Sequence, residues 1–89
     1  MLYKVYTVYD TKAEIYMNPF FQKARGEAIR SFTNLANDES TTVGKYPADF
    51  VLFEIGEYDD SSGELISGVH TSLGVALEYV GNSVPMAVS

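Results

Sequence analysis

The stretch of sequence that most constrains the fold is residues 47–66, PADFVLFEIGEYDDSSGELI. Its side chains alternate between two faces, with Val51, Phe53 and Ile55 on one face and Leu52, Glu54 and Tyr58 on the other. This period of two, over β-branched and aromatic residues, is typical of a strand with one face in a core. Residues 59–63 then supply turn chemistry, because Asp and Ser side chains bind nearby backbone groups and Gly63 accepts a positive φ. We therefore expect a β-hairpin onto which the other elements pack.

Two more strands and a helix are predicted before this hairpin. Residues 2–9 alternate and have high β-propensity, which predicts a strand, and residues 14–17 predict a returning strand that ends before Pro19. Across residues 26–37 the apolar side chains instead follow the i, i+3, i+4 spacing of an amphipathic helix. Residues 38–45 are polar, so we expect a loop there.

The chain after the hairpin has two interpretations. A short helix is indicated by the spacing of Leu73, Ala76, Leu77 and Val80. A strand is the alternative, because Gly74 and the β-branched Val75 both weaken a helix. We expect residues 81–89 to form a flexible tail.

Together these elements predict an α+β fold in a single domain, residues 1–80. The expected order is strand, strand, helix, strand, strand and an undecided element, which gives a mostly antiparallel sheet of about four strands with one amphipathic helix. The face of the sheet away from the helix carries several tyrosines, so it either meets solvent or forms an interface. A chain of 89 residues buries only about 60–65% of the surface exposed when it is unfolded, so the core is small.

The composition excludes several classes of protein. There is no cysteine, which rules out disulfides, thiolate chemistry and cysteine-based zinc sites. No apolar run reaches about 18 residues, and Met1 leads directly into strand-like alternation, so we expect neither a transmembrane helix nor a signal peptide. The single histidine, His70, lies near Ser72 without a nucleophile elbow, and no phosphate-binding loop is present. We therefore expect a non-enzymatic protein without a cofactor.

Charge is unevenly distributed along the chain, whose net charge is −6. All six basic residues lie within residues 1–45, whereas residues 46–89 contain seven acidic residues and no Lys or Arg. Because an acidic half repels phosphate, we expect nucleic acid to bind only at a basic face of the first half. The candidates for that face are Lys4, Lys12, Lys23, Arg25 and Arg30.

A second group of candidate residues surrounds the predicted hairpin turn. It consists of the acidic residues Glu54, Glu57, Asp59, Asp60 and Glu64. Carboxylate oxygens suit a hard cation, but these residues lack the twelve-residue spacing of an EF-hand. We therefore expect a solvated hairpin tip without a metal ion.

Tyrosines on the first two predicted strands form a third candidate group. Bases of single-stranded nucleic acid stack on aromatic rings while nearby cations meet the phosphates. Such a platform would combine Lys4 and Lys12 with Tyr3, Tyr6, Tyr9 and Tyr16. The alternative is that half of these rings are core, because a two-layer domain buries one face of its sheet.

Several segments, taken in their order along the chain, resemble a known protein family. They are residues 5–13 (VYTVYDTKA), 18–21 (NPFF), 25–30 (RGEAIR) followed by Phe32, 37–38 (ND) and 46–60 (YPADFVLFEIGEYDD). Over residues 2–66 the chain is similar to the small nonstructural protein of microviruses, the tailless phages with circular single-stranded DNA, particularly the gokushovirus group. The resemblance implies a DNA-binding or single-stranded-DNA-synthesis protein that acts in the cytoplasm of an infected bacterium and is absent from the capsid. It implies no catalytic residues.

Three hypotheses follow from the residues and the resemblance. The leading one is a phage accessory protein in DNA replication or packaging that binds single-stranded DNA weakly through Lys4, Lys12, Lys23, Arg25 and Arg30. The alternative is an adaptor that contacts a viral replication protein or a host protein, without touching DNA, through Glu57, Asp59, Asp60 and Glu64. A homodimer formed through an edge strand or the aromatic face is compatible with both functions.

Overall fold

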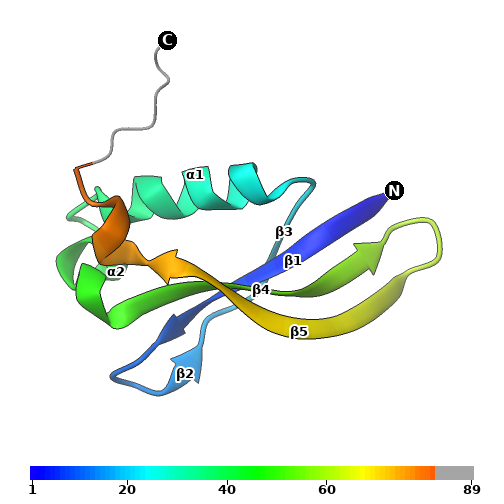
Figure 1. Ribbon diagram of the computed structural model, residues 1–89, viewed down its shortest axis with the longest axis horizontal. Coiled ribbons are helices and arrows are strands. Elements are labelled where there is room, and N and C mark those ends of the chain that lie inside the picture. The colour runs from blue at the N-terminus through cyan, green and yellow to red at the C-terminus, as the bar shows by residue number, and fades with distance from the viewer. Residues whose placement is uncertain (82–89) are drawn as a thin grey trace, which may run out of the picture.

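The structure is a computed structural model that describes residues 1–81, within which a five-stranded antiparallel sheet carries a long helix on one face (Figure 1). The first half of the chain contains β1 (Leu2–Asp10), β2 (Ile15–Tyr16), β3 (Phe20–Gln22), α1 (Arg25–Ala36) and α2 (Thr42–Lys45). The second half contains a 3₁₀ turn (Pro47–Asp49), β4 (Phe50–Asp59), β5 (Glu64–Val75) and a second 3₁₀ turn (Ala76–Tyr79). The predicted α+β class, antiparallel sheet and main helix are confirmed.

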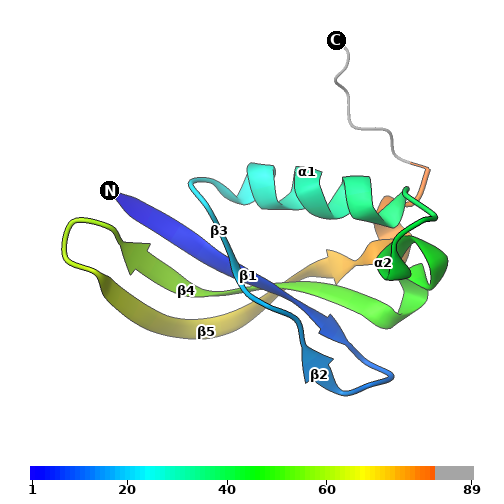
Figure 2. The ribbon, with the colours of Figure 1, turned by 180° about the vertical axis from the view of Figure 1, so that it is seen from behind.

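The strands are ordered β2-β1-β4-β5, and β3 also pairs with β1. β1 is the central strand: β4 pairs with it along its whole length, while β2 and β3 pair in succession with its other edge (Figure 2). β5 pairs with β4 and forms an edge of the sheet within the described part of the chain. The turn between β1 and β2 and the turn between β4 and β5 therefore lie at opposite ends of the molecule (Figure 1).

The core lies between α1 and one face of the sheet. Three residues of α1 at a spacing of four, Ala28, Phe32 and Ala36, point toward the sheet and are buried. This spacing places them on one side of the helix. They pack with Tyr6, Val8, Val43, Phe50, Leu52 and Ala76. Burying each large apolar side chain contributes about 1.5–3 kcal/mol, so this cluster provides most of the stability of the two-layer fold.

Tyr6 is an unusual member of this core. Its side chain is fully buried, and its hydroxyl has no hydrogen-bonding partner within residues 1–81. Burial raises the pKa of this hydroxyl above its ordinary value, because the charged form would lose its hydration. Tyr6 is therefore a core residue and does not belong to the tyrosine platform considered above.

The side chains of β4 do not alternate regularly between the two faces of the sheet along the whole strand. Phe50 and Leu52 face the core, whereas Phe53 lies on the side away from α1, across from Thr7 of β1. The register then shifts by one residue between Glu54 and Gly56, which is a β-bulge. The prediction that Tyr58 shares a face with Leu52 is therefore wrong, because the bulge moves Tyr58 to the face of Phe53.

Three segments outside the hairpin also differ from their predicted form. Phe20–Gln22, which lies outside the predicted strands, forms β3 against β1. The predicted loop 38–45 contains α2, whose Thr41 side chain accepts a hydrogen bond from the Gly44 backbone N–H at 3.0 Å. Within 67–80 the strand interpretation holds as far as Val75, and a 3₁₀ turn follows in place of an α-helix. Of the predicted tail 81–89, all but Gly81 lies outside the described residues.

Candidate binding surface

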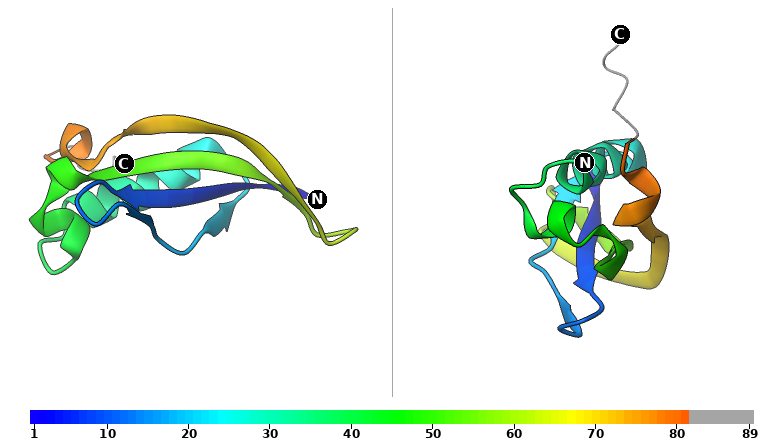
Figure 3. Two further views of the ribbon diagram at one scale, coloured as in Figure 1. Left: turned by 90° about the horizontal axis from the view of Figure 1, so that it is seen from below. Right: turned by 90° about the vertical axis from the view of Figure 1, so that its left-hand side faces the viewer.

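The face of the sheet away from α1 carries a group of aromatic side chains in mutual contact. Figure 3 (left) looks onto the sheet with α1 behind it. We call Tyr9, Tyr16, Phe53 and His70 the ring cluster. Tyr16 is at its centre. The centroid of the Tyr16 ring lies 4.5 Å from the ring centroid of Tyr9, 6.1 Å from that of Phe53 and 5.7 Å from that of His70. Because Tyr16 is 46% exposed, the cluster presents aromatic surface to solvent.

Strand pairing explains why these four rings meet. Tyr9 and Tyr16 are direct partners across β1 and β2, so their side chains leave the sheet on the same face. Phe53 comes from β4 and His70 from β5, and their ring centroids are 6.2 Å apart. Four strands therefore contribute to a cluster that no local sequence pattern could reveal.

A second aromatic site lies nearer the β4–β5 turn. The rings of Phe21 and Tyr58 are 5.5 Å apart, and together with Tyr3 and Asp60 they line a surface hollow. We call this site the aromatic hollow. Tyr3 and Tyr58 are cross-strand partners, which is a direct consequence of the bulge in β4. The helix-free face is thus aromatic at both ends.

The predicted basic residues do not form a single surface. Lys4 and Arg25 come together around Glu54, with Lys4 Nζ 4.0 Å from one carboxylate oxygen and Arg25 Nε 3.1 Å from the other. Lys4 Nζ also lies 3.4 Å from Glu57 Oε2. These pairs lie on the side of the sheet that α1 covers, since Lys4 alternates with Tyr3 and Val5 along β1. Their positive charge is partly neutralised there.

The other three basic candidates are exposed and form no ion pair within residues 1–81. Lys12 lies in the turn between β1 and β2, the ribbon that carries Tyr9 and Tyr16. Lys23 lies between β3 and α1, and Arg30 lies on α1. Lys12 is therefore the candidate on the ribbon that carries Tyr9 and Tyr16, whereas Lys23 and Arg30 lie outside that ribbon.

The acidic candidates divide in a similar way. Glu57 pairs with Lys4, whereas Asp59, Asp60 and Glu64 surround the β4–β5 turn. The backbone N–H of Ser61 donates a 2.9 Å hydrogen bond to the Asp59 carboxylate and lowers the pKa of that carboxyl below its ordinary value. Gly63 has a φ of 75°, which confirms the positive φ predicted for it. In the described part of the chain, no group of three or more metal-ligating side chains is arranged to hold an ion.

Comparison with known protein families gives a match that covers most of the structure. The model of the phage ORF5 protein family matches residues 3–79, from β1 to the second 3₁₀ turn. The chain belongs to the phage ORF5 protein family. No curated protein and no solved structure shows significant similarity to it.

Membership of the phage ORF5 family confirms the phage origin expected from the resemblance. The match also extends beyond residue 66, where the resemblance ended, and includes β5 with His70. Both aromatic sites of the sheet therefore lie within the residues that the family model matches. None of the helices described for this family member has the length and hydropathy needed to cross a bilayer.

For this phage ORF5 family protein, sequence reasoning found only part of the aromatic surface. Tyr3, Tyr9 and Tyr16 were predicted for a platform, and all three lie on the helix-free face. Phe53, His70 and Phe21 were missed as site residues. The alternation of Phe53 with buried Leu52 carries a signal for its face, but the position of His70 depends on the irregular register between β4 and β5.

Proposed function

We propose that this phage protein is a non-enzymatic accessory factor in viral DNA replication or packaging, which binds single-stranded DNA weakly in the cytoplasm of the infected bacterium. The observation that carries the proposal is the exposed ring cluster on the helix-free face of the sheet. Bases stack on such rings irrespective of sequence, with about 1–3 kcal/mol for each base. The family assignment and the resemblance to the nonstructural protein of microviruses support the viral context.

The charges around the ring cluster indicate how the DNA would be held. Lys12 lies in the turn that joins the strands of Tyr9 and Tyr16, whereas Lys4 and Arg25 are paired with carboxylates on the other side of the sheet. The net charge of −6 opposes any extended contact with phosphates. Stacking therefore supplies most of the affinity, and binding is weak and only slightly dependent on salt.

The experiment is a titration of labelled single-stranded and duplex oligonucleotides at two salt concentrations. We expect a preference for the single strand and a salt dependence that corresponds to about one phosphate contact, a slope near −0.7. Tyr16→Ala should weaken binding about five- to 100-fold, because one stacked base is lost. Lys12→Glu should weaken binding as well, while Lys45→Glu on α2 serves as the charge-matched control.

A triple variant distinguishes the ring cluster from the helix side. Replacing Lys23, Arg25 and Arg30 by Gln removes three cations without adding acidic residues, and it abolishes binding if the cations near α1 hold the DNA. We expect this variant to retain most of its affinity. A steep salt dependence together with an unaffected Tyr16→Ala variant would contradict the role of the ring cluster, and no binding at low salt would end the DNA proposal.

The alternative function, an adaptor that touches no DNA, is favoured by a different observation. Three acidic side chains, Asp59, Asp60 and Glu64, surround the β4–β5 turn in a half of the chain without Lys or Arg. A viral replication protein or a host protein with a basic surface fits such a turn. A variant in which the three acidic residues are neutralised should no longer capture that partner in a pull-down, whereas the Tyr16→Ala variant should still capture it.

A further inference from the structure

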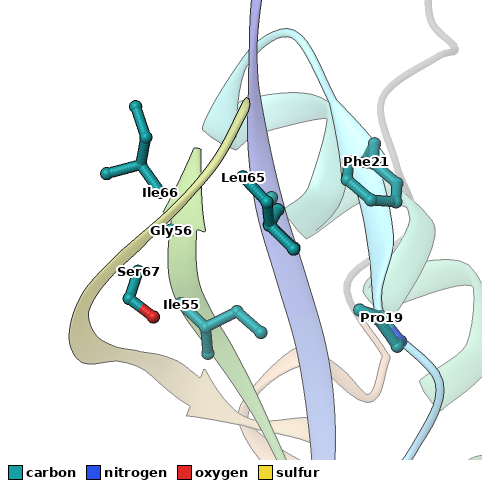
Figure 4. Close-up of a pocket in the computed structure, with 8 residues that line it drawn as sticks. Pro19, Phe21, Ile55, Gly56, Leu65, Ile66 and Ser67 are labelled. Atoms are coloured by element: carbon teal, nitrogen blue, oxygen red, sulfur yellow. The ribbon is translucent and has the colours of Figure 1, made fainter. Parts of the chain in front are cut away.

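Two hollows adjoin at the hairpin end of the helix-free face and share one side chain. Phe21 lines the aromatic hollow defined above and also a smaller depression, which we call the apolar slot. The slot lies over β1, with β3 on one side and β4 and β5 on the other (Figure 4). It is lined by Val5, Pro19, Phe21, Ile55, Gly56, Leu65, Ile66 and Ser67. The side chains that line it are apolar except for Ser67, which contributes a hydroxyl group.

The apolar slot has the dimensions of a site for one side chain. Its volume is about 140 Å³, whereas pockets for drug-sized molecules measure about 300–1,000 Å³. Figure 4 shows Phe21, Pro19, Ile55 and Leu65 around the depression. Leu65 is 66% exposed and Phe21 is 45% exposed, so both leave large apolar surfaces in water. A partner that covers them gains hydrophobic contact.

The aromatic hollow next to the slot suits a cation. The faces of Tyr3, Phe21 and Tyr58 carry partial negative charge, and Asp60 adds a carboxylate to the same hollow. The Met1 ammonium lies 2.8 Å from Asp60 Oδ1 and 3.8 Å from Asp59 Oδ1, so it offsets one negative charge at this turn, and the turn stays net negative because it carries Asp59, Asp60 and Glu64. An anionic ligand would be repelled here, both by Asp60 and by its neighbours Asp59 and Glu64.

We propose, as a more specific form of the adaptor function on which it rests, that this part of the sheet docks a segment of a partner protein. The segment places a large apolar side chain in the apolar slot and a Lys or Arg side chain in the aromatic hollow. The shared wall at Phe21 makes the two sites neighbours, so one short segment reaches both. The aromatic hollow lies toward the β4–β5 turn, at the opposite end of the sheet from the β1–β2 turn (Figure 1). The apolar slot lies between this hollow and the ring cluster, and the two sites share no lining residue with that cluster.

Charge decides between a basic partner and the other candidates for this site. Single-stranded DNA carries phosphates that the acids of the β4–β5 turn repel. A second copy of the chain has a net charge of −6 and brings its own acidic half, which opposes self-association at this surface. A basic segment of a different protein is attracted by the same charges.

The test uses NMR spectra of the isotope-labelled full chain and three short peptides in which leucine alternates with arginine, serine or glutamate. We expect the leucine–arginine peptide to shift the signals of Tyr3, Phe21, Tyr58 and Leu65, with an affinity about tenfold above that of the leucine–serine peptide. The leucine–glutamate peptide should not bind. Equal affinities for the arginine and serine peptides, or shifts confined to other residues, would overturn the proposal.

Two exposed positions provide variants that leave the core intact. Leu65→Asp should abolish binding of the leucine–arginine peptide, and Asp60→Asn should weaken it several-fold, about three- to tenfold. Glu39→Gln, between α1 and α2, is the charge-matched control and should bind as the unaltered chain does. Unchanged peptide affinity in both Leu65→Asp and Asp60→Asn would refute the site.

The same samples separate this site from its alternatives. Signals of the slot that shift with protein concentration before any peptide is added would identify a second copy as the occupant and overturn the proposal. Asp60→Asn should leave binding to a single-stranded oligonucleotide intact, and Tyr16→Ala should leave binding to the peptide intact. Loss of both activities in either variant would show a single surface and contradict the separation of the two sites.

Discussion

At the scale of single residues, the close approach of β4 and β5 depends on Gly56. A Cβ atom at this position would collide with the backbone carbonyl oxygen of Ile66. The absence of a side chain lets the two backbones cross where the register of β4 shifts. The same shift places Tyr58 beside Tyr3 and Phe21, so this glycine is a precondition for the aromatic hollow.

We expect Gly56→Ala to lower the free energy of unfolding by about 1–3 kcal/mol, because backbone atoms on a paired strand cannot move away cheaply. The matched control is Gly26→Ala in α1, where a Cβ atom meets nothing within 4 Å. That change should raise the free energy of unfolding by about 0.4–1 kcal/mol, since alanine favours the helix and restricts the unfolded chain. Urea denaturation measures both, and a neutral Gly56→Ala variant would contradict the predicted collision.

Asp59 gives the β4–β5 turn a dependence on pH. The Ser61 N–H holds the pKa of the Asp59 carboxyl below its ordinary value of 3.8. A carboxyl with a lowered pKa in the folded state contributes stability that is fully present above its unfolded-state pKa. That contribution is lost as the pH falls through the lower, folded-state pKa. We therefore expect the turn to weaken only below about pH 3.8.

Carbon-13 NMR titration of the Asp59 carboxyl measures this shift directly. Ser61→Ala keeps the backbone donor, so the pKa of Asp59 should stay low in that variant. Asp59→Asn should remove the corresponding part of the acid dependence of stability. A carboxyl that titrates at or above 3.8 in the unaltered chain would be evidence against the hydrogen bond.

At the scale of elements, Asn37 joins the end of α1 to the end of the described chain. Its Nδ2 donates to the Thr33 carbonyl at 2.8 Å and to the Tyr79 carbonyl at 3.0 Å. Its Oδ1 accepts a 2.7 Å hydrogen bond from the Gly81 N–H. The helix ends at the predicted position, and the residue that ends it also holds the second 3₁₀ turn against α1.

We expect Asn37→Ala to lower the free energy of unfolding by about 1–3 kcal/mol, because backbone groups of two elements lose their partner. Hydrogen exchange at the Gly81 amide should accelerate most, since its acceptor is removed. Asn34→Ala, at an exposed position on α1, is the control and should change stability by less than about 0.5 kcal/mol. Unchanged exchange at Gly81 in Asn37→Ala would contradict this role.

At the scale of the whole molecule, the fold is a two-layer structure in which α1 covers only one face of the sheet (Figure 3). The open face is aromatic at both ends, and the two ends differ in charge. Lys12 lies in the turn of the ribbon that carries Tyr9 and Tyr16, whereas Asp60 lines the aromatic hollow. One sheet can therefore offer two binding sites with opposite preferences for charged ligands.

The division between a covered and an open face predicts unequal effects of two similar substitutions. Leu52→Ala should lower the free energy of unfolding by about 2–5 kcal/mol, because Leu52 is fully buried under α1. That is a large part of the total of about 5–10 kcal/mol expected for a domain of this size. Leu65→Ala on the open face should cost less than about 1 kcal/mol. Thermal and urea unfolding measure the difference, and similar costs would show that the open face is covered in solution.

The sequence by itself determined the elements whose rules are local. Strand alternation in β1 and β4, helical spacing in α1 and the glycine of the hairpin turn each depend on residues only a few positions apart. Turn chemistry and hydrophobic period act over such short distances, so the presence and type of these elements were predicted correctly, whereas the faces of β4 beyond the bulge were not. Membership of a phage protein family could also be predicted from the sequence, because several segments that follow one another in a fixed order along the chain carry the resemblance.

Tertiary structure alone decided the features that join distant residues. The bulge at Ile55 depends on how β1, β4 and β5 pair, and it moved Tyr58 to the open face. Lys4 lost its availability to phosphate through Glu57, a residue 53 positions away. The ring cluster likewise needs four strands in register. A local pattern carries no information about such contacts, since their geometry exists only once the sheet has formed.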